Sequence, residues 1–336
     1  MQSTNLIVLS QIEIETFLVE GRLERLRELI APCRVVDAES FTDASWLELL
    51  KEANPKILVA GWKTKPLPAN ACAEIAPALK YICYLPGSIR KLVPRELIEQ
   101  GVTVTNWSSS ISRTVAECAL LLSLACMRRV AYWSHQMHDQ GGWKDVKTVT
   151  QSLFDRRVGI HGFGAVAKAL LPLLRPFTDK ISTYTEGVPE SVFKEYGIRQ
   201  ETSLERLFAE NDVVIELEAL TPEREKIVDE KLLRSIPAGG AFVNVARGAL
   251  VDEDALFRVA QEGRLQVGLD VYTVEPLPAD HPFRGCRNIV LLPHLGGPST
   301  DRRRDAADHS LENLRRFQSG EPVLQPITLE IYDRST

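Results

Sequence analysis

The chain has 336 residues, 44% of them hydrophobic and 25% charged, which is typical of a soluble globular protein and excludes a mainly disordered or coiled-coil chain. Its length is typical of two domains of ordinary size. Forty Lys and Arg against 45 Asp and Glu give a net charge of −5. That balance argues against a nucleic-acid partner, because proteins that bind nucleic acid usually carry a basic excess.

The cysteines and the apolar segments indicate a compartment. The six cysteines form no C-x-x-C pair and have no histidine at zinc-binding spacing, so we predict no metal site and a cytoplasmic protein with reduced thiols. The apolar run near Met1 is too short for a signal peptide. The longest uncharged apolar stretch, Cys118–Met127, is well below the roughly 20 residues that span a bilayer, so we expect a buried or subunit-interface helix and no membrane association.

In the first third of the chain, short β-branched runs alternate with amphipathic stretches, which predicts a parallel sheet covered on both faces. The predicted strands are Leu6–Leu9, Arg34–Val36, Ile57–Ala60, Tyr81–Tyr84 and Val102–Thr105. The helices predicted here include Leu23–Ile30, Trp46–Ala53, Arg95–Gln100 and a long helix at about Arg113–Arg129.

A second alternating series follows that long helix. Its predicted strands are Arg157–Ile160, Lys180–Tyr184, Val213–Ile215, Ala241–Val245, Gln266–Val271 and Ile289–Leu292. Six strands separated by helices suit one complete doubly wound nucleotide-binding domain. We expect the last helix, about Asp301–Gly320, to pack back on the first domain. Its arginines Arg302–Arg304 are interleaved with aspartates, which favours a solvated, ion-paired face.

A glycine-rich loop lies between the first strand of this series and the helix after it. Gly162, Gly164 and Ala167 match G-x-G-x-x-A, in which the first glycine makes the turn and the second lets the backbone approach a pyrophosphate. Ala167 would keep helix and strand close together. The alternative is a glycine turn that binds no ligand.

The ribose of a dinucleotide usually meets an acidic residue about 20 residues after the loop. Thr185 stands close to where an Asp would be, and Glu186 follows it. No Arg between Tyr184 and Arg199 is placed to receive a 2′-phosphate, although Lys194 could reach the site. We therefore predict NAD as the cofactor, with NADP as the less favoured choice.

Three polar residues follow three neighbouring strands in the last third of the chain. They are Arg247, Glu275 and His294, and ligands bind open α/β sheets beyond the carboxyl ends of the strands. Arg can hold a carboxylate or polarise a carbonyl, His can exchange a proton near neutral pH, and a neighbouring Glu orients the imidazole. Each residue also has an ordinary structural explanation, but together they predict a hydride-transfer site for a 2-oxo or 2-hydroxy acid.

The sequence resembles the D-isomer-specific 2-hydroxyacid dehydrogenase family over nearly its whole length. The matching segments are Asn244–Glu253, Gly268–Val271, Glu275–Leu277, Leu292–Gly297, Asp212–Val214, Leu220–Glu223 and Thr114–Glu117. The resemblance implies a Rossmann domain with a doubly wound parallel sheet, residues 108–297. That domain would be inserted into a smaller flavodoxin-like α/β substrate domain made of residues 1–107 and 298–336.

The resemblance also implies roles for single residues. Arg247 would bind and orient the substrate, His294 would be the acid/base, and Glu275 its partner. Gly87 and Ser88 would hold the substrate carboxylate through backbone N–H groups. The predicted cofactor contacts are Gly162, Phe163, Gly164, Ala165, Val166, Glu186, Thr114, Ala246, Asp270 (toward the nicotinamide carboxamide) and Gly297. The resemblance further implies a homodimer formed through the helix near 113–129.

Three departures from the family pattern lie on the cofactor side. The segment Ile215–Ala219 reads I-E-L-E-A where the family usually has S-L-H-x-P. His161 replaces an apolar residue before the glycine loop, and Thr185-Glu186 replaces the usual Asp. These departures bear on cofactor affinity and preference, whereas the catalytic trio is intact.

The substrate side chain would be recognised mainly by the first domain, where Trp62, Lys63, Ile89 and Arg90 are candidates. Two cations there would favour a second anionic group on the substrate, unless Lys63 and Arg90 simply point into solvent. The leading hypothesis is an NAD-dependent D-2-hydroxyacid dehydrogenase or reductase. The alternatives are an NAD(H)-binding sensor or corepressor-like protein on the same scaffold, and an enzyme acting on formate or phosphite.

Overall fold

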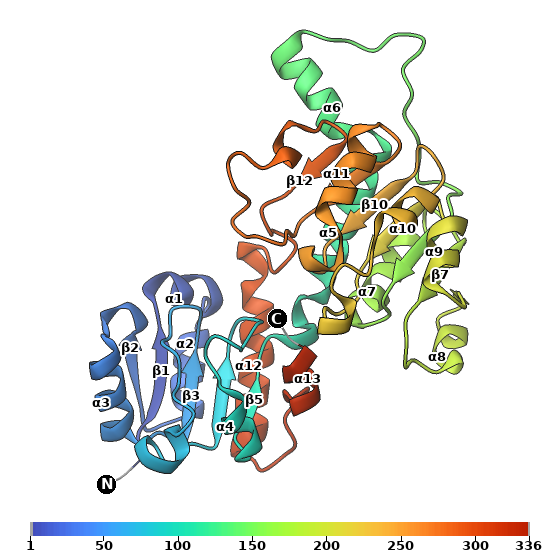
Figure 1. Cartoon of the computed structure of the whole chain (residues 1–336). Helices are drawn as coiled ribbons and strands as arrows, with labels where there is room; N and C mark the ends of the chain where they lie inside the picture. Colours follow the sequence, from blue (N-terminus) through green and yellow to red (C-terminus); the bar gives the residue numbers. More distant parts are fainter. Residues whose placement is uncertain (1–2, 335–336) are drawn as a thin grey trace. The chain divides into compact units, whose positions relative to one another are not determined.

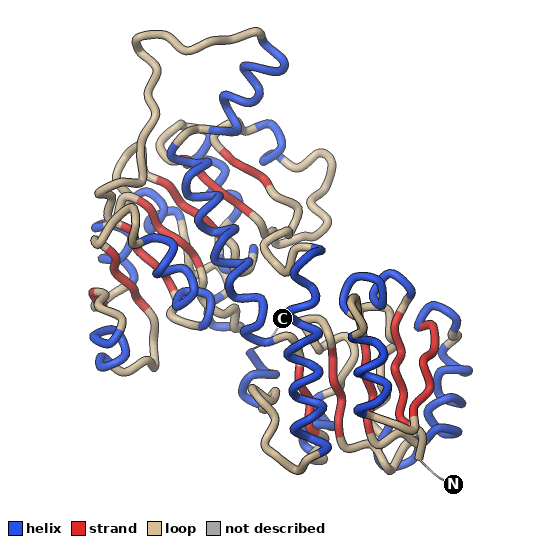
Figure 2. Tube along the Cα trace, turned by 180° about the vertical axis from the view of Figure 1, so that it is seen from behind, coloured by secondary structure: helices blue, strands red, loops and turns tan. Residues whose placement is uncertain are grey.

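The structure, a computed structural model, describes residues 3–334 and divides into two compact units (Figure 1). Unit 1 contains the chain up to Ile111 together with the chain from Pro298 onward. Unit 2 is the intervening segment, Ser112–Gly297. In each unit the strands lie side by side with helices packed on both faces, as Figure 2 shows.

Unit 1 is built on a five-stranded parallel sheet. Its strands are β1 (Asn5–Leu9), β2 (Cys33–Asp37), β3 (Ile57–Ala60), β4 (Tyr81–Tyr84) and β5 (Thr103–Thr105), in the order β2-β1-β3-β4-β5. This is the flavodoxin-like order. All five strands predicted for this region are present, and β1, β3 and β4 are wholly buried, as expected for apolar strands covered on both faces.

Six α-helices cover this sheet. They are α1 (Gln11–Phe17), α2 (Arg22–Leu29), α3 (Asp43–Ala53), α4 (Arg95–Glu99), α12 (Arg303–Gln318) and α13 (Leu329–Arg334). The late helix α12 packs as expected, since Leu311 and Leu314 are buried with residues of β1, β3 and β4. Two short helices, α1 and α13, were not predicted. Helix α1 starts at a capping box formed by Ser10 and Glu13, in which the backbone N–H of Ser10 donates to the Glu13 carboxylate.

Unit 2 is built on a seven-stranded parallel sheet. Its strands are β6 (Val158–His161), β7 (Ile181–Tyr184), β8 (Arg199–Gln200), β9 (Val213–Glu216), β10 (Ala241–Asn244), β11 (Gln266–Leu269) and β12 (Ile289–Leu291). The order β12-β11-β10-β9-β6-β7-β8 is the doubly wound Rossmann order extended by one strand. The six predicted strands are present. The seventh, β8, is a two-residue edge strand too short to leave a sequence pattern.

The helices of unit 2 are α5 (Ser112–Met127), α6 (Val130–His135), α7 (Ala165–Leu174), α8 (Glu190–Glu195), α9 (Leu204–Glu210), α10 (Glu230–Ser235) and α11 (Glu253–Gln261). The segment Ser108–Met127 is long and apolar enough to cross a membrane by length and composition, but half of it is buried inside the protein. Helix α5 packs on β10, β11 and α7. Leu122 lies so close to β11 that a side chain on Gly268 would meet it. This packing is that of a core helix.

Candidate active site

Three polar residues, Arg247, Glu275 and His294, lie beyond the carboxyl ends of β10, β11 and β12, which are neighbouring parallel strands. His294 Nδ1 lies 2.7 Å from Glu275 Oε2. Desolvation lowers the pKa of Arg247 from its usual value, and the nearby Glu275 carboxylate opposes that shift. The three residues predicted from the strand ends are therefore neighbours, because parallel strands deliver their ends to one edge.

The His294–Glu275 pair has one bound and one open face. A carboxylate only accepts hydrogen bonds, so Nδ1 of His294 donates to Glu275 and Nε2 is left for another partner. The other oxygen of Glu275 accepts from Tyr272 N–H at 3.0 Å, which orients the carboxylate. The His294 and Glu275 side chains are 48% and 35% exposed, so the pair is accessible to a small molecule.

Asp270 holds the loop that carries His294. Its two carboxylate oxygens accept from the N–H groups of Leu295 at 2.6 Å and Gly296 at 2.7 Å, and its carbonyl accepts from His294 N–H at 2.9 Å. These bonds support His294 in its left-handed conformation, φ +55°. Burial raises the pKa of Asp270, while the two N–H groups oppose this. Asp270, which we predicted as a cofactor contact, therefore also positions the imidazole.

The turn that presents Arg247 is held by Asn244, whose role the sequence analysis missed. The Asn244 side chain accepts from Ala246 N–H and donates to the Arg247 carbonyl, both at 2.9 Å. A Cβ at Gly248 would overlap the backbone of Tyr272 and Thr273, so only glycine fits after Arg247. An Asn at the last position of a buried apolar strand is the signal that could have revealed this clamp.

The glycine loop fits a dinucleotide. Gly162 has φ +88°, and a Cβ there would lie 2.7 Å from the backbone nitrogen of Glu218, so the turn requires glycine. A Cβ at Gly164, by contrast, would meet nothing within 4 Å, which leaves open space over the backbone. No side chain caps α7, whose N-terminal N–H groups suit a pyrophosphate. Ala167 is fully buried between helix and sheet, as predicted.

The remaining predicted cofactor residues differ in what they offer. The Phe163 side chain is buried against Phe193 and Tyr196, so only its backbone faces the loop. Gly297 has open space beside its Cα. The other predicted contacts, at Thr114, Ala165, Val166 and Ala246, are half-buried or exposed.

The departures from the family pattern come together in one network. His161 Nδ1 lies 2.6 Å from Glu216 Oε2, and the two side chains are 2% and 0% exposed. Desolvation lowers the pKa of His161, but the charge and hydrogen bond of Glu216 outweigh it, so the pKa is raised. Thr185 Oγ1 donates to Glu218 at 3.1 Å. Sequence reasoning listed these residues separately, because the pairing of β6 with β9 joins positions 55 residues apart.

An arginine also reaches Glu186, the acid predicted to contact the ribose, although this arginine lies outside the segment where sequence reasoning looked for one. Arg224 Nη2 is 3.3 Å from Glu186 and Nη1 is 3.4 Å from Glu218. Lys194, the cation considered from the sequence, instead pairs with Glu190 on its own helix at 2.9 Å. Arg224 was missed because it follows β9, whereas the search followed β7.

On unit 1, the predicted carboxylate loop at Gly87 and Ser88 is packed against Trp107. A Cβ at Gly87 would lie 2.5 Å from the Trp107 ring, and Asn106 Nδ2 donates to the Gly87 carbonyl at 2.6 Å. Ser88 is exposed. Trp62 is half exposed and lies between the rings of Phe17 and Trp107, with centroid distances of 5.2 and 6.3 Å.

The idea of two cations beside this loop is wrong for Arg90. Its guanidinium donates to the carbonyls of Tyr332 and Asp333, which fastens α13 to the unit. Ile89 is buried in the core, and Lys63 pairs with Glu39 at 3.4 Å on an exposed surface. Arg90 was misjudged because helix α13, which supplies these carbonyls, was not predicted from the sequence.

The prediction of a solvated, ion-paired face for Arg302–Arg304 is also wrong at one position. Arg302 and Arg304 pair with acids, but Arg303 has its guanidinium 5.2 Å from the Trp62 ring. Its Nε is buried and has no hydrogen-bond partner within the described chain. Helix periodicity places Arg303 on the face toward the sheet, which the charge pattern alone did not reveal.

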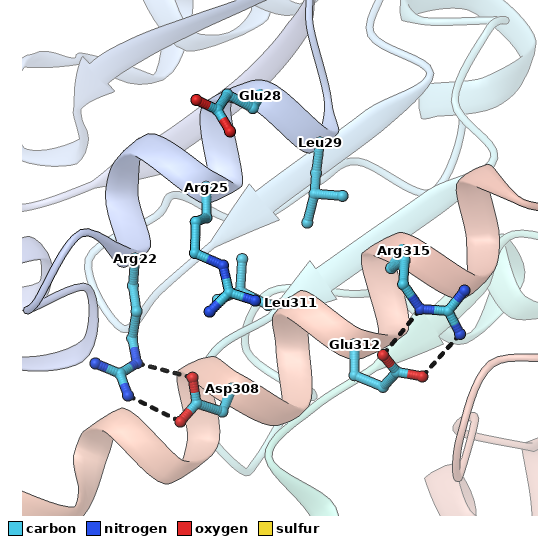
Figure 3. Close-up of a pocket in the computed structure, with 8 residues that line it drawn as sticks. All are labelled: Arg22, Arg25, Glu28, Leu29, Asp308, Leu311, Glu312 and Arg315. Carbon is cyan, nitrogen blue, oxygen red and sulfur yellow. Dashed lines mark hydrogen bonds and ion pairs between the residues drawn. The ribbon is translucent and has the colours of Figure 1, made fainter.

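Unit 1 contains a cavity of about 700 Å³ that is separate from the candidate active site and has no histidine among its lining residues (Figure 3). It lies between α2 and α12 and is lined by matched charges. Arg22 binds Asp308 through two bonds of 2.8 and 2.9 Å, and Arg315 binds Glu312. Within residues 3–334 no group of three or more His, Cys, Asp and Glu is placed to hold a metal ion.

Comparison with known proteins gives a family-level match. The sequence-family model of the D-isomer specific 2-hydroxyacid dehydrogenase NAD-binding domain matches residues 120–296 of this chain. The chain is 32% identical to a hydroxyphenylpyruvate reductase of Plectranthus scutellarioides, over 77% of this chain and 82% of that protein. It is 30% identical to a glyoxylate reductase of Korarchaeum cryptofilum, over 77% and 78%.

Solved structures agree in fold. A D-mandelate dehydrogenase from Rhodotorula graminis superposes with a TM-score of 0.82 at 20% identity, covering 97% of this chain and 98% of that one. A glyoxylate reductase from Paecilomyes thermophila gives 0.79 at 23% identity, covering 97% and 99%. The architecture of the whole chain is therefore shared with these two enzymes.

Proposed function

Because this chain belongs to the D-isomer specific 2-hydroxyacid dehydrogenase family, a family of NAD-dependent enzymes, we propose that it reduces a small 2-oxo acid to the D-2-hydroxy acid, or catalyses the reverse reaction. Unit 2, Ser112–Gly297, contains the NAD-binding domain, and we propose that unit 1 is the substrate domain, for which residues 1–107 and 298–336 were predicted from the sequence. The names of the relatives, glyoxylate reductase and hydroxyphenylpyruvate reductase, support 2-oxo acids as the substrate class.

The cofactor is held by the backbone around Gly162 and Gly164 and by the N-terminus of α7, with Glu186 on the ribose side. When bound, the dinucleotide supplies or accepts a hydride at the substrate carbon. Asp270 and Ala246 lie at the carboxyl edge of the sheet and complete the nicotinamide side. We propose NAD rather than NADP because two acids, Glu186 and Glu218, lie on the proposed ribose side, where their charge would repel a 2′-phosphate.

Arg247 binds the substrate carboxylate and polarises the carbonyl, since its guanidinium keeps its charge and matches both groups. His294 Nε2 would give its proton to the carbonyl oxygen when the 2-oxo acid is reduced, and would take a proton back in the reverse direction. Glu275 stabilises the protonated imidazole and keeps Nδ1 as the donor. Gly87 and Ser88 hold the carboxylate from the substrate domain.

The observation that carries this proposal is the His294–Glu275 pair, 2.7 Å apart and beside Arg247 at the edge where β10, β11 and β12 end. The proposed roles of Arg247, Glu275 and His294 are the same whether the substrate side chain is neutral or carries a second anionic group, because these residues would recognise only the 2-oxo acid group.

The test is NADH oxidation with a panel of neutral, aromatic, dicarboxylic and phosphorylated 2-oxo acids, using wild type and His294→Ala. We expect turnover with at least one acid and a loss of at least ~10²-fold in kcat for His294→Ala, with NADH binding retained. A variant as active as the wild type would remove His294 from its role. Tight NADH binding without turnover of any acid would favour a sensor.

We also propose a cytoplasmic homodimer formed through α5 and the arm that follows it. The arm, α6 and the chain to about residue 150, projects from unit 2 (Figure 1). It carries apolar side chains in solvent, with Trp143 73% exposed and Val146 fully exposed, and Leu121 of α5 is exposed as well. Such a patch is typical of an interface. Light scattering should give twice the 37.6 kDa of one chain, and a monomer would exclude this proposal.

A further inference from the structure

We propose that the cofactor is selected by Arg224 clamped between Glu186 and Glu218, and that the buried His161–Glu216 pair fixes the segment that carries Glu218. This inference rests on the proposed dinucleotide site. Its consequence is that the chain excludes a 2′-phosphate although it possesses the arginine that could bind one.

The clamp places the cation and the two acids at the same strand edge. Glu186 lies after β7, one residue beyond the place where the acid that binds the ribose hydroxyls usually stands, and Arg224 Nη2 lies 3.3 Å from its carboxylate. Arg224 Nη1 lies 3.4 Å from Glu218. One guanidinium between two carboxylates leaves a net negative charge, which repels a phosphate and suits ribose hydroxyl donors.

Glu218 takes part in the role usually given to the residue after β7. Its Oε2 accepts from the Thr185 hydroxyl at 3.1 Å, and its Oε1 accepts from Ala219 N–H at 2.9 Å. Thr185 occupies the place of the usual Asp but brings no charge. The carboxylate of Glu218, from the neighbourhood of β9, supplies a charge to the same position, and only one-tenth of its side chain is exposed.

The buried pair positions this carboxylate. Glu216 uses one oxygen for His161 at 2.6 Å and the other for Glu218 N–H at 2.8 Å. The backbone of Glu218 also lies against Gly162, the turn of the glycine loop, so that a Cβ at this glycine would overlap it. His161 itself directly precedes that glycine. The buried His161–Glu216 pair therefore connects the glycine loop to Glu218 by hydrogen bonds that are shielded from solvent.

The test measures equilibrium binding of NADH and NADPH by fluorescence, which needs no turnover. We expect the wild type to bind NADH at least ~10-fold more tightly than NADPH, since a like charge close to the phosphate is strongly unfavourable. Glu186→Gln/Glu218→Gln should raise NADPH affinity at least ~10-fold by freeing Arg224. Adding Arg224→Ala should remove that gain, and Lys194→Ala, at the neighbouring helix, is the matched control and should leave the NADH/NADPH ratio unchanged.

The positioning role has its own readout. Glu216→Gln keeps an acceptor for Glu218 N–H and should preserve the ratio of NADH affinity to NADPH affinity. Glu216→Ala removes this acceptor and should lower that ratio in the fraction of the protein that remains folded. Equal affinity of the wild type for both dinucleotides, or a double Gln variant with unchanged NADPH affinity, overturns the clamp. If Glu216→Ala leaves the ratio unchanged, the buried pair has no positioning role. These results are independent of catalysis: selective binding without turnover contradicts only the proposed reaction.

Discussion

Unit 2 contains two His–Glu pairs with nearly the same geometry and very different surroundings. His294 and Glu275 are 2.7 Å apart and half exposed, whereas His161 and Glu216 are 2.6 Å apart and almost completely buried. Both use Nδ1 and Oε2. The distance between the two groups therefore does not distinguish the exposed pair, for which we propose a catalytic role, from the buried pair.

The surroundings make the distinction. The His294 side chain is exposed and its Nε2 is not the atom that binds Glu275, so we propose that Nε2 exchanges a proton with a bound molecule. His161 lies inside the sheet, where Glu216 also holds the backbone of Glu218. A buried pair loses more when one partner is removed, because the other charge stays desolvated. An exposed pair loses little stability but can lose its chemistry.

The largest effect is expected from breaking the buried pair. Glu216→Ala should lower the free energy of unfolding by about 3–5 kcal/mol, since it leaves His161 buried without a partner. Glu275→Ala makes the same change at the exposed pair and should cost about 1 kcal/mol or less. Urea titration measures both. Equal losses would mean that burial is not what separates the two pairs.

The exposed pair, for which we propose the catalytic role, should respond in the opposite way. Glu275→Gln keeps the shape but removes the charge that stabilises the protonated imidazole, so kcat should fall at least ~10-fold, with the urea midpoint nearly unchanged. Steady-state kinetics on the best acid of the panel checks this. Asp139→Asn is the matched control, because Asp139 pairs with His135 at 2.7 Å on the exposed arm. A control variant that loses as much activity would contradict the assignment.

Two glycines of the phosphate loop sharpen the contrast between closed and open surroundings. Gly162→Ala should cost about 1–3 kcal/mol, because its φ is +88° and its Cβ would meet Glu218. Gly164→Ala has free space and should leave stability unchanged, but the new methyl group should weaken NADH binding at least ~10-fold by blocking the pyrophosphate. Unfolding and NADH titration separate the two effects. An unaltered NADH affinity in Gly164→Ala would argue against this site.

The smallest effect is a pH dependence of stability. The folded-state pKa of His161 is raised, so its contribution is fully present below about pH 6.5 and is lost as the pH rises through the folded-state pKa. The stability difference between wild type and Glu216→Gln should therefore shrink as the pH rises. His309, whose pKa burial lowers, has the opposite dependence but is present in both proteins and cancels. A difference that grows with pH would refute the assignment.

Much of the site could be predicted because it depends on strand ends. Arg247, Glu275 and His294 each follow an apolar strand, and parallel strands bring their ends to one edge whatever the details of packing. The glycine loop was predictable for the same reason. Contacts between distant segments were not: Arg224 reaching Glu186, Asn244 clamping the Arg247 turn, and Arg90 binding α13 have no local pattern.

The sequence by itself determined the alternation of strands and helices, the glycine loop and the placement of Arg247, Glu275 and His294 at strand ends, because these follow from periodicity and from residue types at strand ends. Only the tertiary structure decided which polar residues are chemically available. It buried His161 with Glu216, placed Arg224 between two acids and left His294 open. The physical reason is that burial and pairing depend on neighbours across the sheet, which are far apart along the chain.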